Sequence, residues 1–330
     1  MKNLTTEYMG LKLENPVVAA SCGLTGSLES VKTLARSGAA AVVLKSIFEE
    51  EILLETDQRL KEAKENPILY SGLSETLDYI DLHIREDNLG KYLELVRQAK
   101  KEVTIPVIAS INCISDEDWT YFTGKIEEAG ADGIELNLFL NPADFESKEF
   151  EKAYFRIIEK VLGVVSIPVS IKISRYFTRL GLSVKALSET GVSGIVMFNR
   201  FYTPDIDIDK LSMVKGKYFS TPDEQLETLR WIAIMSDRVS CDLAASTGIH
   251  TGEDVIKMLL AGASVAQVAS TLYKNGPDQI SRMLKKLEKW MDDKGYQSIG
   301  EFRGKATDDY KKNPAAFERM QFMKHYSQIG

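Results

Sequence analysis

The chain has 330 residues, and its 41 basic and 48 acidic side chains give a formal net charge of −7. This acidic balance, without a basic stripe, disfavours nucleic acid as a partner. The sequence shows neither an apolar run of membrane-spanning length nor a signal-peptide core, so we expect a cytoplasmic protein with no membrane partner. The spacing of its three cysteines and three histidines predicts neither a disulfide framework nor a metal site. The histidines (His83, His250 and His325) fall on predicted exposed or loop positions and are assigned no role.

Two local signals mark the starts of the predicted strands and alternate along the chain. The first is a proline at the head of an apolar run, a position where a buried strand tolerates proline. The second is a glycine that ends a helical pattern, where a left-handed C′ residue is expected. Proline leads the runs at residues 15–18, 105–108 and 167–170, and glycine leads those at 38–42, 130–134, 191–195 and 262–265. An eighth strand is predicted at residues 239–244, which carry neither signal but follow an amphipathic helix.

Helices with an apolar spacing near 3.6 residues separate the predicted strands. One of them starts at Thr251, where Thr251 and Asp254 form a plausible capping box. Eight strands that alternate with helices favour a closed α/β barrel of the TIM (β/α)8 type over a doubly wound sheet, which remains the alternative. We therefore predict a single barrel domain over residues 1–330.

Two segments are too long for ordinary loops and are predicted to be insertions after strands 2 and 6. Residues 48–102 are highly charged and contain at least one helix, at 89–100. This helical insertion could be solvated decoration, an active-site cover or a subunit contact. Residues 199–221 contain the acidic run 205–209, and we interpret this second segment as a lid. Residues 306–330 are expected to form a C-terminal helical extension.

Small residues end two successive strands late in the chain, at residues 243–248 and 266–271. Small side chains let backbone N–H groups approach a phosphate closely, and a helix N-terminus behind them adds a favourable dipole. In a (β/α)8 barrel, the loops after strands 7 and 8 bind phosphate. The two turns therefore predict a phosphate-bearing cofactor or substrate, although small residues also end strands that bind nothing.

Polar residues at other strand ends indicate an anionic, planar ligand. Lys45 and Lys172 lie among apolar strand residues, and we expect them to face an anion rather than to snorkel into solvent. Asn112, Asn137 and Asn199 end strands 3, 4 and 6, and their amides offer donors and acceptors to a heterocycle. Any one of these asparagines could instead terminate its strand by turn bonding.

Longer motifs in the chain resemble the dihydroorotate dehydrogenases, a family of FMN-dependent barrels. The resemblance runs from residues 15–21 to residues 302–305 and is most specific at 261–268 and 294–305. Residues 172–177 are similar to the family's Lys-x-x-Pro-Tyr-Phe motif, with Arg175 in place of the proline. The resemblance therefore implies an FMN cofactor and a small-molecule substrate.

The resemblance also implies roles for individual residues. Lys172 would face the pyrimidine edge of the flavin, and Lys45 and Cys113 are further catalytic candidates. The implied FMN neighbours are Ala20, Ser21, Lys45, Ser46, Asn137 and Lys172, together with the backbone of Ser246, Thr247, Gly248, Ala269 and Ser270. The expected substrate ligands are Asn112, Asn137, Asn141 and Asn199.

The chain departs from the family after strand 4. Members with dihydroorotate activity carry Asn-Leu-Ser-Cys-Pro-Asn or a serine variant there, and that Cys or Ser removes the substrate proton while hydride passes to flavin N5. Here Leu140 occupies the position of the base, and Asn141 lies one place before the family's second asparagine. General-base assistance is worth about 10²–10⁴ in rate. The loop candidates for a substitute base are Cys113, Ser115, Tyr176 and Tyr202.

Several functions stay open on the sequence. The chain could oxidise dihydroorotate with a substitute base, or transfer hydride between FMN and another planar, anionic substrate. From a different class, Lys172 could form a Schiff base in an aldolase-type barrel, and a non-catalytic flavin scaffold is a further alternative. The family resemblance implies a homodimer. It also implies fumarate or a redox partner protein as electron acceptor, such as a subunit with FAD and an iron–sulfur cluster.

Overall fold

A computed structural model describes residues 2–48, 73–112, 116–138, 150–201 and 203–308 of the chain. Its central feature is a closed ring of parallel strands in the order β3, β4, β6, β7, β8, β9, β12 and β13, because β13 pairs back onto β3. The ring strands span Val17–Ala19 (β3), Ala41–Val43 (β4), Val107–Asn112 (β6), Gly133–Asn137 (β7), Val169–Ile173 (β8), Gly194–Met197 (β9), Asp242–Ser246 (β12) and Val265–Val268 (β13). The predicted TIM barrel is confirmed.

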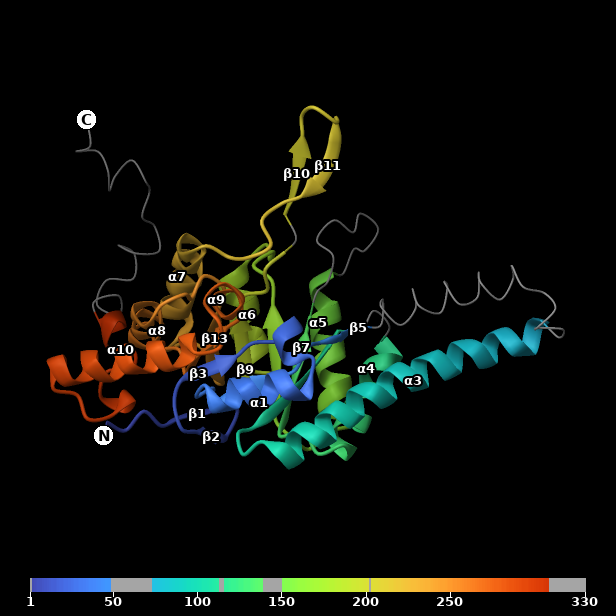
Figure 1. Cartoon of the computed structure of the whole chain (residues 1–330), viewed down its shortest axis with the longest axis horizontal. Coiled ribbons are helices and arrows are strands. Elements are labelled where there is room, and N and C mark those ends of the chain that lie inside the picture. Colours follow the sequence, from blue (N-terminus) through green and yellow to red (C-terminus); the bar gives the residue numbers. More distant parts are fainter. Residues whose placement is uncertain (1, 49–72, 113–115, 139–149, 202, 309–330) are drawn as a thin grey trace.

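Helices connect the strands and cover the outside of the ring (Figure 1). They span Leu28–Arg36 (α1), Leu73–Glu102 (α3), Asp116–Glu128 (α4), Phe150–Leu162 (α5), Leu180–Ser188 (α6), Gln225–Met235 (α7), Gly252–Leu260 (α8), Ser270–Asn275 (α9) and Gln279–Lys294 (α10). Apolar side chains on their inner faces, such as Val31, Trp119 and Ile126, are buried against the strands. Burial of both strand faces is the arrangement expected for a parallel sheet.

The local signals for helix ends are also confirmed. The glycines expected at C′ positions have positive φ values, 98° at Gly38, 90° at Gly130, 100° at Gly191 and 109° at Gly262. At the start of α8, the Thr251 hydroxyl accepts a hydrogen bond of 3.3 Å from the Asp254 amide in the predicted capping box. These features fix where each helix stops and the next strand enters the ring.

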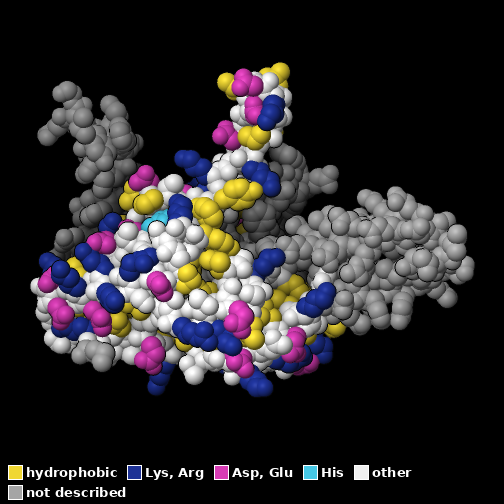
Figure 2. All heavy atoms as spheres, viewed as in Figure 1, with side chains coloured by type: hydrophobic (Ala, Val, Ile, Leu, Met, Phe, Trp, Pro, Cys, Tyr) yellow, Lys and Arg dark blue, Asp and Glu magenta, His cyan; other side chains and the backbone are white. Residues whose placement is uncertain are grey.

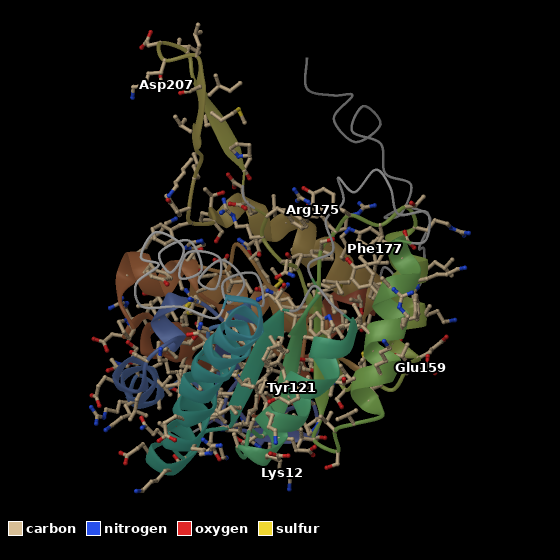
Figure 3. The ribbon with its side chains drawn as sticks, turned by 90° about the vertical axis from the view of Figure 1, so that its right-hand side faces the viewer. Lys12, Tyr121, Glu159, Arg175, Phe177 and Asp207 are labelled. Atoms are coloured by element: carbon tan, nitrogen blue, oxygen red, sulfur yellow. The ribbon has the colours of Figure 1, made fainter. Side chains whose placement is uncertain are left out.

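A small antiparallel hairpin of β1 (Thr6–Tyr8) and β2 (Leu11–Leu13) closes the N-terminal end of the barrel. Tyr8 is fully buried there, and a Cβ atom on Gly194 would lie 2.9 Å from its ring. The Met9 amide donates to Asp242 Oδ2 at 2.9 Å and ties the hairpin to β12. Lys12 of β2 lies at the opposite end of the molecule from Asp207 (Figure 3). The hairpin therefore covers the barrel at the end opposite the C-terminal ends of the strands.

Both predicted insertions contain regular structure. In the first, β5 (Ile47–Phe48) pairs with β6, and α3 is longer than the helix expected at 89–100, while residues 49–72 lie outside the described residues. In the second, β10 (Pro204–Asp207) and β11 (Ser212–Lys215) form an antiparallel hairpin that stands away from the barrel (Figure 1). Apolar side chains are exposed along this hairpin (Figure 2), with Ile208 and Leu211 exposed by 80% and 87%.

Three boundary predictions differ from the structure or cannot be compared with it. Strand 7, expected at 239–244, is observed as β12 at Asp242–Ser246, so Ser246 is the last strand residue rather than part of the loop. We interpreted residues 199–221 as a lid. The two ends of this segment line a cavity at the barrel, whereas the hairpin between them stands clear of the barrel. Of the extension expected at 306–330, residues 309–330 lie outside the described residues.

Within the described part of the chain, no helix is both long and apolar enough to cross a membrane.

Candidate functional site

A cavity of about 200 Å³, partly open to solvent, lies at the C-terminal ends of the ring strands. Its lining includes the predicted residues Ala20, Ser21, Lys172, Asn199, Ser246, Thr247, Gly248, Ala269 and Ser270. Residues from five different strand ends thus meet in one place, as the barrel topology requires.

The first small-residue turn follows β12 and is held in an uncommon backbone conformation. Thr247 and Gly248 both have a φ of 78°. The Thr247 hydroxyl donates to the Phe198 carbonyl at 3.0 Å, and the Thr228 hydroxyl donates to the Ser246 carbonyl at 2.9 Å. A Cβ atom on Gly248 would lie 2.2 Å from the backbone nitrogen of Gln225. The turn therefore requires glycine at position 248, for its conformation and for the close approach of α7.

Ser220, which the sequence did not single out, joins the two small-residue turns. Its amide donates to Ser270 Oγ at 3.0 Å, and its hydroxyl accepts from the Gly248 amide at 3.3 Å. Lys274 Nζ donates to the Ser220 carbonyl at 2.7 Å. The return limb of the second insertion is therefore part of the cavity wall.

His250 lies directly behind Ser220, with its Nε2 3.1 Å from the Ser220 hydroxyl. The residue follows β12 in a loop, as expected, and it is buried. Burial lowers the pKa of His250, and the charge of Lys274 lowers it further. A neutral imidazole therefore supports the wall of the cavity near neutral pH.

The two predicted lysines lie in different surroundings. Lys172 is 8% exposed, lines the cavity and has its Nζ 3.8 Å from Glu135 Oε1. Lys45 follows β4 but is exposed and does not line this cavity. Its neighbour Ser46 is buried and lies 3.1 Å, oxygen to oxygen, from Ser21. The structure thus places Lys172 and Ser21 in the cavity lining and Ser46 in contact with Ser21, whereas the predicted role of Lys45 gains no support from the cavity.

The three predicted strand-end asparagines form a connected group. Asn112 Nδ2 donates to the Asn137 carbonyl at 2.6 Å, and Asn199 Nδ2 donates to Asn137 Oδ1 at 2.7 Å. Only Asn199 of the three is in the cavity lining, so Asn137 acts there through its bond to Asn199. The remaining predicted ligand, Asn141, lies outside the described residues.

Most candidates for the proton-accepting base cannot be compared with the structure. Leu140, Cys113, Ser115 and Tyr202 lie outside the described residues. Tyr176 lines a neighbouring cavity rather than the main one, and its ring packs edge-on against Phe201 at 4.7 Å between centroids. Cys22 follows Ser21 of the main cavity, and its thiol has a raised pKa, chiefly because it is buried. The raised pKa disfavours a thiolate base.

Several residues that the sequence did not assign also shape the cavity. Gln267, Phe198, Arg200 and Ser220 are in its lining. Arg200 Nε donates to Glu224 at 2.8 Å, and its Nη1 donates to the carbonyls of Lys217 and Tyr218. Glu135, which is buried and is not in the lining, did carry a signal, because alternation along residues 133–137 puts it on the same strand face as Asn137. Arg200 and Ser220 carried no comparable signal, since their contacts depend on how the insertion folds back.

The side chains present fit a cofactor that has a phosphate at one end and a polar heterocycle at the other. The phosphate end is matched by the small turns and by the hydroxyls of Ser220 and Ser270. At the other end, the buried Gln267 Oε1 has no hydrogen-bond partner within the described part of the chain, which leaves it available for a ligand N–H group. The described residues contain no group of three or more metal-ligating side chains.

A family model described as dihydroorotate dehydrogenase matches residues 3–291. The chain belongs to the dihydroorotate dehydrogenase family. Members of this family are FMN-dependent oxidoreductases that act on CH–CH groups, so the protein is an enzyme of this class, and FMN is its cofactor.

Curated relatives cover almost the whole chain at low identity. The catalytic subunit of dihydroorotate dehydrogenase B (NAD(+)) from Thermoplasma volcanium is 26% identical over 313 residues, which cover 93% of this chain and 99% of that protein. The corresponding subunit from Pyrococcus furiosus is 26% identical over 92% of this chain and 99% of that protein. Dihydroorotate dehydrogenase A (fumarate) from Lactococcus lactis subsp. cremoris is 26% identical over 92% of this chain and 98% of that protein.

Proposed function

We propose that the protein binds FMN across the cavity and catalyses hydride transfer between flavin N5 and a planar, anionic substrate of the dihydroorotate and orotate type. The observation that carries this proposal is the meeting of Lys172, the Asn137–Asn199 amide pair and the two small-residue turns at one cavity. FMN supplies the hydride acceptor, and the protein supplies binding, orientation and electrostatics.

The phosphate of FMN would lie between the two turns. The backbone of Ser246, Thr247 and Gly248 faces it from one side, and Ala269 and Ser270 face it from the other. Lys274, which donates to the Ser220 carbonyl, adds positive charge close to this end. Hydrogen bonds between backbone amides and a charged oxygen are stronger than neutral ones.

The pyrimidine edge of the flavin would lie over Lys172. An ammonium group there stabilises negative charge on the reduced ring because the site is shielded from bulk water. Ala20 and Ser21 form the adjoining wall, and the Ser21–Ser46 contact holds the loops after β3 and β4 together. Asn199, with Asn112 and Asn137 behind it, would orient the substrate above the ring.

A second candidate keeps FMN but changes the substrate. Leu140 cannot accept a proton, so a compound that needs no base at this position would suit the chain better than dihydroorotate. The aldolase alternative is less consistent with the geometry. A Schiff-base lysine must present a free amine, whereas Lys172 Nζ lies 3.8 Å from a buried carboxylate.

The test is anaerobic mixing of FMN-loaded protein with L-dihydroorotate while the flavin absorbance is followed. Rapid bleaching would support dihydroorotate as substrate and show that Leu140 is not limiting. Bleaching by dithionite but not by dihydroorotate would favour the second candidate. A colourless protein that binds no added FMN, and that borohydride traps with an aldehyde, would contradict the proposal and favour the aldolase.

The electron acceptor and the assembly belong to the same proposal. We infer a homodimer located in the cytoplasm, and we infer fumarate or a redox partner subunit as the acceptor. The relatives carry names of both kinds, a catalytic subunit that uses NAD(+) and an enzyme that uses fumarate. Mixing the reduced protein with fumarate separates the two, because only a fumarate-type enzyme would be reoxidised rapidly without a partner.

A further inference from the structure

A fully buried carboxylate lies under the floor of the cavity. Glu135, in the middle of β7, is 0% exposed. Its Oε2 accepts a hydrogen bond of 2.7 Å from Gln267 Nε2, and its Oε1 lies 3.8 Å from Lys172 Nζ. Within the described residues, Oε1 has no hydrogen-bond donor. An ionised carboxylate in such a place is costly unless a charge compensates it, and Lys172 is the cation beside it.

The strand register explains why these side chains meet. In the pairing of β7 with β8, Glu135 lies opposite Ser170 and Asn137 lies opposite Lys172. Residues two apart on a strand share a face, so Glu135 forms the layer directly below Asn137 and Lys172. Gln267 comes from β13, on the opposite side of the ring. The Gln267–Glu135 hydrogen bond therefore spans the barrel interior and forms a polar floor under the cavity.

The floor determines how much positive charge reaches the ligand. The charges of Glu135 and Lys172 interact strongly because little water lies between them. The negative carboxylate cancels part of the positive field of Lys172, so a ligand above Lys172 is stabilised less. Gln267, which lines the cavity, holds the carboxylate in place through Nε2, and its buried Oε1 has no hydrogen-bond partner among the described residues.

We propose that Glu135 is a positioning residue that acts through Lys172 and lowers the reduction potential of the bound flavin. This inference rests on the proposed function, in which Lys172 faces the pyrimidine edge of FMN. The ammonium group stabilises the reduced flavin there. Glu135 limits that stabilisation because its carboxylate partly neutralises the ammonium charge. Gln267 fixes the distance between the two charges.

The test is the flavin midpoint potential of Glu135→Gln, which removes the charge but keeps the side-chain shape and an acceptor for Gln267. We expect the ratio of reduced to oxidised flavin at a fixed solution potential to rise about tenfold, a shift of about 30 mV for a two-electron couple. Glu159→Gln is the matched control, because Glu159 is exposed on the outer face of α5 (Figure 3) and the charge change is the same. This control should leave the ratio within about twofold of wild type.

Lys172→Met tests whether Glu135 acts through the lysine. In that background, Glu135→Gln should change the ratio less than twofold, because the ammonium group through which Glu135 acts is absent. An equal tenfold effect with and without Lys172 would overturn the inference. So would a Glu135→Gln ratio that matches the Glu159→Gln control.

Two further measurements test whether the charge of Glu135 is responsible and whether the ion pair is present in the flavin-free protein. Glu135→Asp keeps the charge and should shift the ratio less than threefold, so a tenfold shift in this variant would overturn the inference. In the flavin-free protein, Glu135→Gln and Lys172→Met together should lower the unfolding midpoint by less than the sum of their separate effects. Additive effects would contradict the ion pair. A protein that binds no FMN would overturn the proposed function and this inference together, whereas bound FMN with an unchanged ratio would overturn the inference alone.

Discussion

Asn199 Nδ2 donates a hydrogen bond of 2.7 Å to Asn137 Oδ1 and so joins the ends of two strands that are not neighbours. The strand between them is β8, which carries Lys172, and Asn199 Nδ2 also lies 3.3 Å from the Lys172 carbonyl. The bond therefore passes over the end of the strand that supplies the cationic side chain. It commits Asn199 Nδ2, which leaves Asn199 Oδ1 for a ligand.

This amide pair predicts a defect in substrate binding when it is broken. Asn199→Ala should weaken binding of orotate about tenfold, equivalent to about 1.4 kcal/mol, because a ligand hydrogen bond and the orientation of Asn137 are both lost. Binding of FMN should change less than threefold. Titration of the flavin absorbance with orotate measures the first effect. Asn275→Ala, on the exposed side of α9, is the control, and equal weakening in the two variants would contradict the assignment.

The turn after β12 predicts a specific requirement for glycine. Gly248 and Gly295 both have a φ of 78°, but of the two only Gly248 would bring a Cβ atom against backbone, 2.2 Å from the Gln225 nitrogen. A left-handed conformation alone costs an L-residue about 1–2 kcal/mol. Crowding adds about 1–3 kcal/mol. Gly248→Ala should therefore lower the free energy of unfolding by that additional amount relative to Gly295→Ala, measured by urea denaturation without flavin.

The same two variants separate the phosphate site from general stability. Gly295→Ala should bind FMN as wild type does, whereas Gly248→Ala should lose at least tenfold in FMN affinity. If both variants bind FMN equally well, the turn after β12 does not hold the phosphate.

His250 predicts a pH dependence of stability. Its pKa in the folded protein is lowered from 6.5 by burial and by Lys274, although Asp254 and Glu224 oppose the shift. Between that lowered value and pH 6.5, the unfolded chain binds more protons than the folded one, so the free energy of unfolding falls as the pH drops below 6.5. The carboxyl groups of Asp254 and Glu224 have lowered pKa values and lose their contribution only at more acidic pH.

Thermal unfolding of flavin-free protein from pH 7.5 to 5 checks this prediction. His250→Gln keeps a polar side chain but cannot take up the proton, so it should flatten the slope just below pH 6.5. An identical slope in the variant and the wild type would assign the pH dependence to other groups.

Leu140 predicts a gain of function. Leu140→Cys should raise residual oxidation of dihydroorotate, by up to about 10²-fold if the thiol reaches the position of the family base. Leu140→Ala is the control for the change in size. Stopped-flow bleaching of the flavin measures both, and an unchanged rate in the cysteine variant would mean that the shape of the loop is the larger defect.

The parts of the fold that the sequence predicted are those with local causes. Pro106 and Gly130 mark strand entry through the constraints of their own backbones, and Thr251 and Asp254 form a capping box within one helical turn. The turn at Ser246 to Gly248 was likewise predicted from its own small residues. Strand 7 was placed too early because Asp242 is fixed by a distant contact, the bond from the Met9 amide, which no local pattern reports.

The parts that the sequence missed depend on contacts between distant residues. Glu135 and Gln267 are 132 residues apart, and Ser220 reaches Ser270 and His250 across 50 and 30 residues. Nothing in the residues around Ser220 signals these contacts, because they form only when the second insertion returns to the barrel. Lys45 shows the converse, since a lysine at a strand end matched the expected pattern but does not line the cavity.

The most direct test of the central claim compares FMN with riboflavin, which has the same ring but no phosphate. Titration of flavin-free protein, followed by quenching of flavin fluorescence, gives both dissociation constants. If the turns after β12 and β13 hold the phosphate, riboflavin should bind at least about 100-fold more weakly, because charge-assisted hydrogen bonds worth about 1.5–3 kcal/mol each are lost. Equal affinity for the two flavins, or binding of neither, would contradict the account.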